Sequence, residues 1–322
     1  MHVLITGAAG MLGRKIVAQI AAGGIGGQAV TRLGLADVVP APVPAGFAGT
    51  VDALTGNLAD AGVAAAWLAG KPDVILHLAA VVSAEAESDF DKGYAVNLDG
   101  TRALFDGIRA LGYHPRVVMA SSIAVFGAPF PEKIGDEFFN APLTSYGTQK
   151  AMADLLLSDY TRKGIFDGVA LRLPTLIVRP GKPNKAASGF FSSILREPLV
   201  GQEALLPVGD DVRHWFASPR RAAGFFAHAA AMDTARIGPR RALNMPGLSA
   251  TIGEMIEALR RVAGSDAVAC IRRVDDPVTE GIVAGWARDF DPVRARALGF
   301  VADASLDEII RIHIEDDLGG SL

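Results

Sequence analysis

Three glycines near the start of the chain, Gly7, Gly10 and Gly13, lie between a short apolar run and an amphipathic stretch. Residues 3–6 are expected to form a buried strand, and residues 11–22 a helix. In a strand–turn–helix unit the first glycine allows a tight turn. The second lets backbone N–H groups approach an anion at the helix N-terminus, and the third lets helix and strand pack closely. The GxxGxxG spacing is weak by itself, but this context indicates a site for the pyrophosphate of a dinucleotide.

The first half of the chain alternates short apolar runs with helical patterns. Such alternation predicts βαβ units, and therefore an α/β fold with a doubly wound, Rossmann-like parallel sheet covered by helices on both faces. Residues 1–178 are expected to be the dinucleotide-binding domain. The expected strands are 3–6, 33–36, 74–79, 117–120 and 169–173, with one more ending at 55–58, and the main expected helices are 11–22, 96–111 and 146–163.

Residues 179–322 are expected to form a smaller mixed lobe that binds substrate, with part of it returning to the first domain. Prolines at positions 180, 183, 198, 207 and 219 are expected to break this region into loops and short elements. Thr251 and Glu254 have the spacing of a capping box, which predicts the start of a helix. Ser305 and Glu308 predict the start of the last helix in the same way.

Composition argues against several classes of function. The chain has 322 residues and a net charge of −4, so its charge does not favour binding to nucleic acid or to an anionic membrane surface. It has one cysteine, and its six histidines show no ligand spacing, so no metal site is predicted. It contains no run of about 18 apolar residues, the length needed to span a membrane. We expect a cytoplasmic protein that acts on a small molecule.

Asp37 follows the second expected strand and lies 24 residues beyond Gly13. A carboxylate at this place can accept hydrogen bonds from the ribose hydroxyls of adenosine, and it repels a 2′-phosphate. Arg32, the only cation nearby, precedes the strand and is at the wrong end to bind such a phosphate. Asp37 therefore favours NAD over NADP as the cofactor.

Ser122, Tyr146 and Lys150 form the set expected to carry the chemistry. Tyr146 and Lys150 are four residues apart and share one face of a predicted helix, while Ser122 follows the fifth expected strand. A tyrosine is a poor base at its ordinary pKa of about 10, and a nearby lysine ammonium favours the phenolate. Ser122 is expected to bind the substrate oxygen and hold it in line. The set predicts proton transfer by Tyr146 coupled to hydride transfer.

The chain resembles the extended short-chain dehydrogenase/reductase family, also called the NAD-dependent epimerase/dehydratase family. The segments that carry the resemblance are Gly7–Gly13, His77-Leu78-Ala79-Ala80, Asn97-Leu98-Asp99-Gly100-Thr101, Ser121–Gly127, Tyr146-Gly147-Thr148-Gln149-Lys150 and Arg296–Phe300. The resemblance extends over essentially the whole chain. One departure is Phe126, where most relatives carry tyrosine. The resemblance implies an NAD-dependent oxidoreductase that forms a homodimer through helices near 96–111 and 146–163.

The resemblance also implies which residues contact the cofactor. In the glycine segment these are Gly7, Gly10, Met11, Leu12 and Gly13, and the others are Asp37, Asn57 and Leu58 beside the adenine, Leu78, Ala79 and Ala80 along the cleft, Asn97, Tyr146, Lys150, and Pro174 and Thr175 at the nicotinamide amide. Asn97 is expected to support the catalytic tyrosine and lysine through the backbone or a water.

A narrower resemblance is to the D-erythronate dehydrogenase branch. It rests on residues 171–175, 179–191 and 213–220. The branch implies oxidation of the C2 hydroxyl of a four-carbon sugar acid, D-erythronate, to the 2-keto acid with NAD. Such a substrate needs a cation for its carboxylate and several polar donors.

Candidate substrate contacts are Ser122, Tyr146, Lys185, Ser188 and Arg213, with Lys185 and Arg213 as the carboxylate partners. By contrast, Arg179 and Lys182 are expected to be surface or interdomain charges. His77 is expected to be a structural histidine with satisfied hydrogen bonds. His214 is left open between a substrate donor and a loop residue.

The sequence leaves one other function open and argues against two more. A nucleoside-diphosphate-sugar epimerase would use the same catalytic set, and the sequence leaves it as the alternative. A dehydratase would need an acid and a base after Ser122, where this chain has Ile123 and Ala124. A cofactor-sensing binding protein on this fold would typically lose the tyrosine, whereas Tyr146 and Lys150 are both present.

Overall fold

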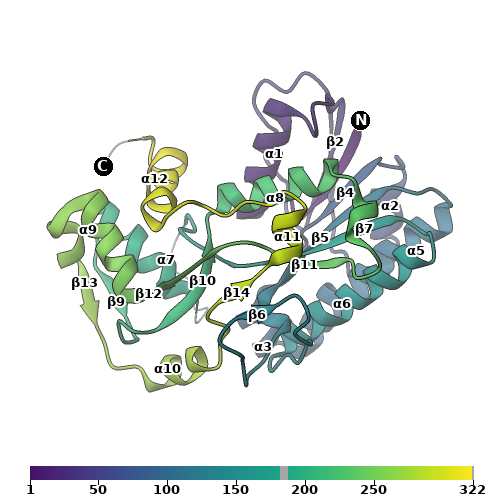
Figure 1. Cartoon of the computed structure of the whole chain (residues 1–322). Helices are drawn as coiled ribbons and strands as arrows, with labels where there is room; N and C mark the ends of the chain where they lie inside the picture. The colour runs from purple at the N-terminus through teal and green to yellow at the C-terminus, as the bar shows by residue number, and fades with distance from the viewer. Residues whose placement is uncertain (182–187, 321–322) are drawn as a thin grey trace.

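A central sheet of seven parallel strands organises the larger part of the molecule (Figure 1). The computed structural model describes residues 1–181 and 188–320. The strand order is β11-β7-β5-β4-β1-β2-β3, which confirms the expected α/β doubly wound fold. The strands are β1 (His2–Thr6), β2 (Arg32–Asp37), β3 (Thr50–Thr55), β4 (Val74–His77), β5 (Arg116–Ser122), β7 (Asp167–Leu173) and β11 (Ala242–Asn244). The last of these comes from the second half of the chain.

Both faces of the sheet are buried, because successive strand residues enter two different apolar cores. In β1, Val3 and Ile5 pack with α1 (Met11–Gly23) and α8 (Pro219–Ala231). Leu4, between them, packs on the opposite face. That face is covered by α2 (Val63–Leu68), α5 (Thr101–Leu111) and α6 (Ser145–Arg162). The continuous apolar runs seen in the sequence are thus explained by burial on both sides.

The structure differs from two of the expectations about local structure. The helix expected at 96–111 begins as a π-helical turn, η1 (Ala95–Gly100), before α5, and such turns often occur at functional sites. Pro219 does not break the chain. It stands at the first position of α8, after Ser218, whose side chain accepts a hydrogen bond from the backbone N–H of Arg221. Proline is tolerated at this position because the first N–H groups of a helix have no intrahelical partner.

The smaller lobe, on the left in Figure 1, has its own apolar core, which includes Phe191, Phe216, Met255 and Leu259. Its helices are α7 (Gly189–Arg196), α9 (Ile252–Ala269), α10 (Pro277–Ala284) and α12 (Leu306–Asp317). Its strands are β8 (Thr175–Leu176), β9 (Ala204–Leu206), β10 (Arg213–Ala217), β12 (Leu248–Thr251) and β13 (Ile271–Arg273). The remaining elements of the chain are α3 (Ser83–Ser88), α4 (Phe90–Tyr94), η2 (Ile123–Val125), β6 (Ile134–Gly135), η3 (Pro198–Val200), η4 (Thr234–Ile237), β14 (Phe290–Asp291) and α11 (Val293–Ala297).

The two predicted helix starts differ in detail. At α9 the capping box is complete, since Thr251 and Glu254 each accept a hydrogen bond from the other's backbone N–H. At α12, Ser305 accepts from the N–H of Glu308, but the Glu308 carboxylate accepts from Ala304 and not from Ser305. Among the described residues, no helix combines the length and the hydropathy that crossing a bilayer requires.

Candidate active site

The glycine segment is built for close approach of backbone to backbone. Gly7 has a φ of +74°, and a Cβ there would lie 2.8 Å from the backbone nitrogen of Ala79. A Cβ on Gly13 would lie 2.2 Å from the carbonyl oxygen of Gly7. Any side chain at either position would push β1, α1 and the turn after β4 apart. The first and third glycines are therefore required by the packing of the fold itself.

Gly10 has a different role. It is exposed and precedes α1 without a side chain that caps the helix. A Cβ there would meet only the Gly7 carbonyl oxygen, at 3.3 Å, so packing alone does not explain this glycine. The first N–H groups of α1 are left available to an anion, and the helix dipole favours negative charge at this end.

A cavity of about 350 Å³ opens at this point. Its wall from the larger domain consists of Gly7, Gly10, Met11, Leu12, Gly13, Leu78, Val82 and Ala120, and its wall from the smaller lobe consists of Arg179, Pro180, Gly189, Ser192 and Arg196. Six of the predicted cofactor contacts thus line one cavity. The glycine turn, the uncapped helix end and the cationic opposite wall fit a pyrophosphate.

Asp37, at the end of β2, is fixed beside the glycine segment. Its carboxylate accepts hydrogen bonds from the N–H of Ala9 at 2.9 Å and of Val38 at 2.7 Å. This geometry holds the acceptor where a ribose next to the pyrophosphate would need it. The Asn57 side chain is used in its own turn, accepting from Ala59 at 3.1 Å, and Leu58 is buried.

Ser122, Tyr146 and Lys150 come together as predicted, from the end of β5 and the first turns of α6. The Lys150 Nζ lies 5.7 Å from the centre of the Tyr146 ring. Burial raises the pKa of Tyr146 to about 12, and the hydrogen bond from Ser122 acts against that increase. In this arrangement the tyrosine is protonated at neutral pH, so it needs further positive charge near its oxygen before it can act as a base.

Lys150 is 6% exposed and donates to the backbone oxygen of Ala120, which lines the cavity, at 2.9 Å. Burial lowers the pKa of Lys150 to about 8, and the charge of Asp154 partly opposes this. Asp154 lies one turn further along α6 and forms a buried ion pair with Arg172 on β7, at 2.9 Å. Asp154 was not predicted from the sequence, although its spacing of four residues from Lys150 was a usable signal.

Asn97 lies in the π-helical turn η1 and does not contact the catalytic pair directly. Its amide exchanges two hydrogen bonds with the backbone of Val81, at 2.8 and 3.2 Å, and donates to the side chain of Gln149 at 2.7 Å. Gln149 immediately precedes Lys150. Asn97 therefore ties the segment after β4 to the helix that carries the tyrosine and the lysine, and it acts at one remove from them.

The two histidines near the site are both buried. His77 bonds to the hydroxyls of Thr6 at 2.7 Å and Thr101 at 2.9 Å, and burial lowers its pKa to about 3. It is the satisfied structural histidine that was expected. His214 bonds to the Thr175 hydroxyl at 2.6 Å and stacks on Phe191, and burial lowers its pKa to about 4.

These contacts fix the segment that follows β7. His214 holds Thr175, while Pro174 beside it is buried. His214 is thus a neutral residue that positions Thr175, which does not match the loop interpretation.

Of the two residues predicted to bind the substrate carboxylate, the structure describes only one. Lys185 lies outside the described residues. Arg213 donates to the backbone oxygen of Ser249 at 3.2 Å and pairs with Glu254 at 3.5 Å. A substrate carboxylate would have to compete with Glu254 for this guanidinium. Ser188 accepts a hydrogen bond from Arg179 at 3.2 Å.

Arg179 and Arg196 are cavity residues that the sequence did not indicate. Arg179 was expected to be a surface or interdomain charge, and it is half-buried and lines the cavity between the two parts of the chain, opposite Gly10. Arg196 ends α7, and no motif singled it out. Both residues lie in the smaller lobe and reach the glycine segment only through the way the two parts of the chain pack.

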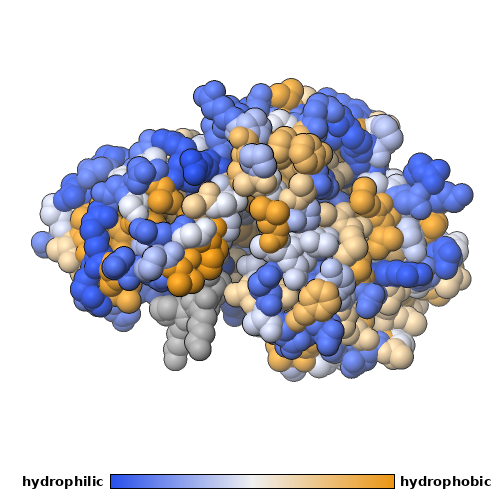
Figure 2. All heavy atoms as spheres, turned by 90° about the horizontal axis from the view of Figure 1, so that it is seen from below, coloured by the Kyte–Doolittle hydropathy of each residue, from blue (hydrophilic) through white to orange (hydrophobic). Residues whose placement is uncertain are grey.

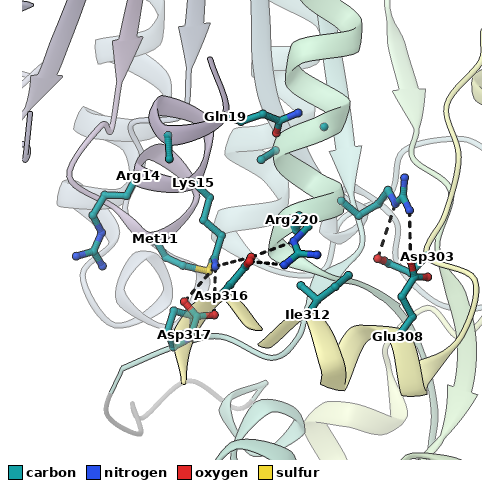
Figure 3. Close-up of a pocket in the computed structure, with 15 residues that line it drawn as sticks. Met11, Arg14, Lys15, Gln19, Arg220, Asp303, Glu308, Ile312, Asp316 and Asp317 are labelled. Atoms are coloured by element: carbon teal, nitrogen blue, oxygen red, sulfur yellow. Dashed lines mark hydrogen bonds and ion pairs between the residues drawn. The ribbon is translucent and has the colours of Figure 1, made fainter. Parts of the chain in front are cut away.

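A second cleft, of about 1040 Å³, lies between α1, α8 and α12 (Figure 3). Several of its charged side chains point toward one another: Lys15 pairs with Asp316 and Asp317, and Arg220 also pairs with Asp316, whereas Arg14 points away. These pairs join the helix that starts at the glycine segment to the C-terminal helix. Because the Lys15, Asp316 and Asp317 side chains are each less than a quarter exposed, these pairs hold α1 against α12.

Comparison with known proteins agrees with this geometry. Residues 3–235 match the model of the NAD dependent epimerase/dehydratase family. The chain is 46% identical to D-erythronate dehydrogenase of Cupriavidus necator over 98% of both chains. It is 38% identical to D-erythronate dehydrogenase of Haemophilus influenzae over 99% of this chain and 100% of that one.

A solved structure is closer still in sequence. The structure described as the nucleoside-diphosphate-sugar epimerase from Agrobacterium tumefaciens is 60% identical, with a TM-score of 0.97, and covers 100% of this chain and 95% of that one. The glycine segment, the Ser122–Tyr146–Lys150 set and these similarities lead to one assignment. The chain belongs to the NAD dependent epimerase/dehydratase family.

Proposed function

We propose that this protein oxidises the C2 hydroxyl of D-erythronate to 2-dehydro-D-erythronate, with NAD as the hydride acceptor. The observation that carries the proposal is that the catalytic set is assembled in a chain similar over nearly its whole length to two D-erythronate dehydrogenases. Asp37, held beside the glycine segment, supports NAD over NADP because its carboxylate would repel a 2′-phosphate.

In the proposed reaction Tyr146 accepts the proton of the C2 hydroxyl and Ser122 donates a hydrogen bond to the same oxygen. Lys150, anchored on the Ala120 carbonyl, places its ammonium beside the tyrosine ring. When bound, NAD supplies the hydride acceptor and a positive charge that favours the phenolate. The raised pKa of Tyr146 then predicts faster oxidation at alkaline pH.

The substrate is proposed to lie between two functional units, residues 1–178 and residues 179–322, beyond the carboxyl ends of β5 and β7. Ser122 and Tyr146 would bind its hydroxyl groups, and Ser188 would be a further donor from the smaller lobe. Lys185 and Arg213 remain the proposed partners of its carboxylate.

We also propose a homodimer that forms through the face of α6 and its neighbours. Phe90 on α4 is 58% exposed and Leu155 on α6 is 67% exposed, so this face offers apolar side chains to a second copy of the chain. Figure 2, which views the molecule from below, shows several apolar areas among hydrophilic side chains. A sedimentation mass of one chain would contradict the dimer. A cytoplasmic location is part of the same proposal, and cell fractionation tests it.

A nucleoside-diphosphate-sugar epimerase is the alternative, favoured by the description of the 60% identical structure. Both reactions use the same tyrosine and lysine. They differ in the fate of the cofactor, since an epimerase regenerates NAD in each turnover and a dehydrogenase releases NADH.

The experiment that tests the proposal is NADH formation, followed by absorbance, with NAD and a panel of four-carbon sugar acids at mildly alkaline pH. The panel contains D-erythronate, D-threonate and L-threonate. Rapid NADH formation with D-erythronate supports the proposal, and preference for a threonate would revise the C2 or C3 configuration. No NADH with any acid, together with NAD that stays bound through purification, would favour the epimerase.

A further inference from the structure

Two arginines of the smaller lobe face the glycine segment across the cavity. Arg196, at the end of α7, donates through Nη1 to the backbone oxygen of Arg179 at 2.7 Å. Arg179 in turn donates to the backbone oxygen of Ser188 at 3.0 Å and to its hydroxyl at 3.2 Å. The Arg179 guanidinium is therefore held in one place by Ser188, which directly precedes α7.

Of these two arginines, Arg196 has a carboxylate partner within the described residues and Arg179 has none. Arg196 pairs with Glu197 at 2.5 Å, and both side chains are almost completely buried. Among the ion pairs of the described residues, none involves Arg179. Burial lowers the pKa of Arg179, and the charge of Arg196 lowers it further. A partly buried cation beside a second cation is costly for the fold unless an anion joins it.

The opposite wall of the cavity is suited to the same anion. Gly10 leaves the N-terminus of α1 uncapped, and this end of the helix carries partial positive charge. A group placed between Gly10 and Arg179 would meet backbone N–H groups on one side and a guanidinium on the other. A pyrophosphate has negative oxygens on both sides and fits such a site better than a single carboxylate.

We propose that Arg179, positioned by Arg196 and Ser188, binds the pyrophosphate of the cofactor opposite the glycine segment. The smaller lobe then supplies half of the phosphate site, and the cofactor links the two parts of the chain. This inference rests on the proposed function only for the presence of NAD, and it can be tested without any sugar acid.

The test compares Arg179→Gln and Arg179→Met with wild type and with the matched control Arg260→Gln. Arg260 lies on α9 and is exposed, and within the described part of the chain its side chain pairs only with residues of its own helix. Dissociation constants are measured by calorimetry for ADP-ribose, and by displacement of NADH fluorescence for adenosine, which has no phosphate. Thermal unfolding without ligand is recorded for every variant.

Both Arg179 variants are expected to weaken ADP-ribose binding by about tenfold or more, as for loss of a charge-assisted contact, and to leave adenosine binding within about twofold. The unliganded Arg179→Met protein should unfold at the same temperature as wild type or higher, because an unbalanced charge is removed. A merely structural arginine would instead lower that temperature.

ADP-ribose affinity within about twofold of wild type in either folded variant would overturn the proposal. If the KM for the sugar acid then rose alone, Arg179 would be a substrate carboxylate contact. The methionine variant keeps the test open should the glutamine variant fail to fold, since a methionine side chain is apolar and needs no hydrogen-bond partner of its own in this half-buried position. Failure of the proposed function would appear separately, as an absence of NADH formation with intact ADP-ribose binding.

Discussion

The buried ion pair behind Lys150 gives the sharpest prediction about this site. Asp154 is 2% exposed and its Oδ2 lies 2.9 Å from the Nε of Arg172, which is 11% exposed. Asp154→Asn keeps the size of the side chain and removes its charge, leaving the arginine buried without a carboxylate. Loss of one partner of a buried pair costs about 3–5 kcal/mol. The free energy of unfolding of the variant is expected to fall by that amount.

The same change alters the catalytic lysine. Burial lowers the pKa of Lys150 to about 8, and the Asp154 charge keeps it from falling further. Because a lysine is charged below its pKa, wild-type Lys150 keeps its ammonium up to about pH 8. In Asp154→Asn the ammonium is lost at a lower pH. The variant should therefore lose kcat/KM as the pH rises through values below 8, where the wild type retains most of its lysine charge.

Two assays check these effects. Urea denaturation should show a midpoint lower by roughly 1 M or more, for a slope of about 3 kcal/mol per molar. A pH profile of kcat/KM, recorded under conditions in which Asp154→Asn stays folded, separates the effect on Lys150 from the loss of stability. Asp159→Asn is the matched control, since Asp159 lies on the same helix and is 58% exposed in its pair with Arg162, and it should change stability by less than about 1 kcal/mol. The reasoning is refuted if Asp154→Asn is as stable as Asp159→Asn and has the wild-type pH profile.

Three further predictions follow from the site. Tyr146→Phe should lower kcat by about a hundredfold to ten-thousandfold, while the dissociation constant for NADH, measured by fluorescence, changes by only a few-fold; turnover near the wild-type rate would mean that another group is the base. Asp37→Ala should shift the ratio of kcat/KM for NAD and NADP toward NADP by about tenfold, and an unchanged ratio would remove its assigned role. Gly13→Ala should abolish measurable NADH binding in calorimetry, because the added Cβ would lie 2.2 Å from the Gly7 oxygen, and wild-type affinity would show that the turn can move without cost.

The sequence predicted well what depends on local periodicity. Apolar runs, glycine positions and helix spacing are local, so the parallel sheet, the glycine turn and the shared face of Tyr146 and Lys150 could be inferred directly. The placement of Asp37 at the end of β2 follows for the same reason. The π-helical turn at Asn97 could not be inferred, because its spacing differs from that of an α-helix by a single residue.

Contacts between distant segments were decided only by the tertiary structure. Arg172 reaches Asp154 from another element, and Arg213 meets Glu254. Arg179 faces the glycine segment only because the smaller lobe packs against the larger domain, and no residue near it in the chain signals this. A charged side chain carries no periodic pattern that identifies its partner. The sequence therefore determined the cofactor turn and the catalytic pair, whereas packing between the lobes determined which cations complete the site.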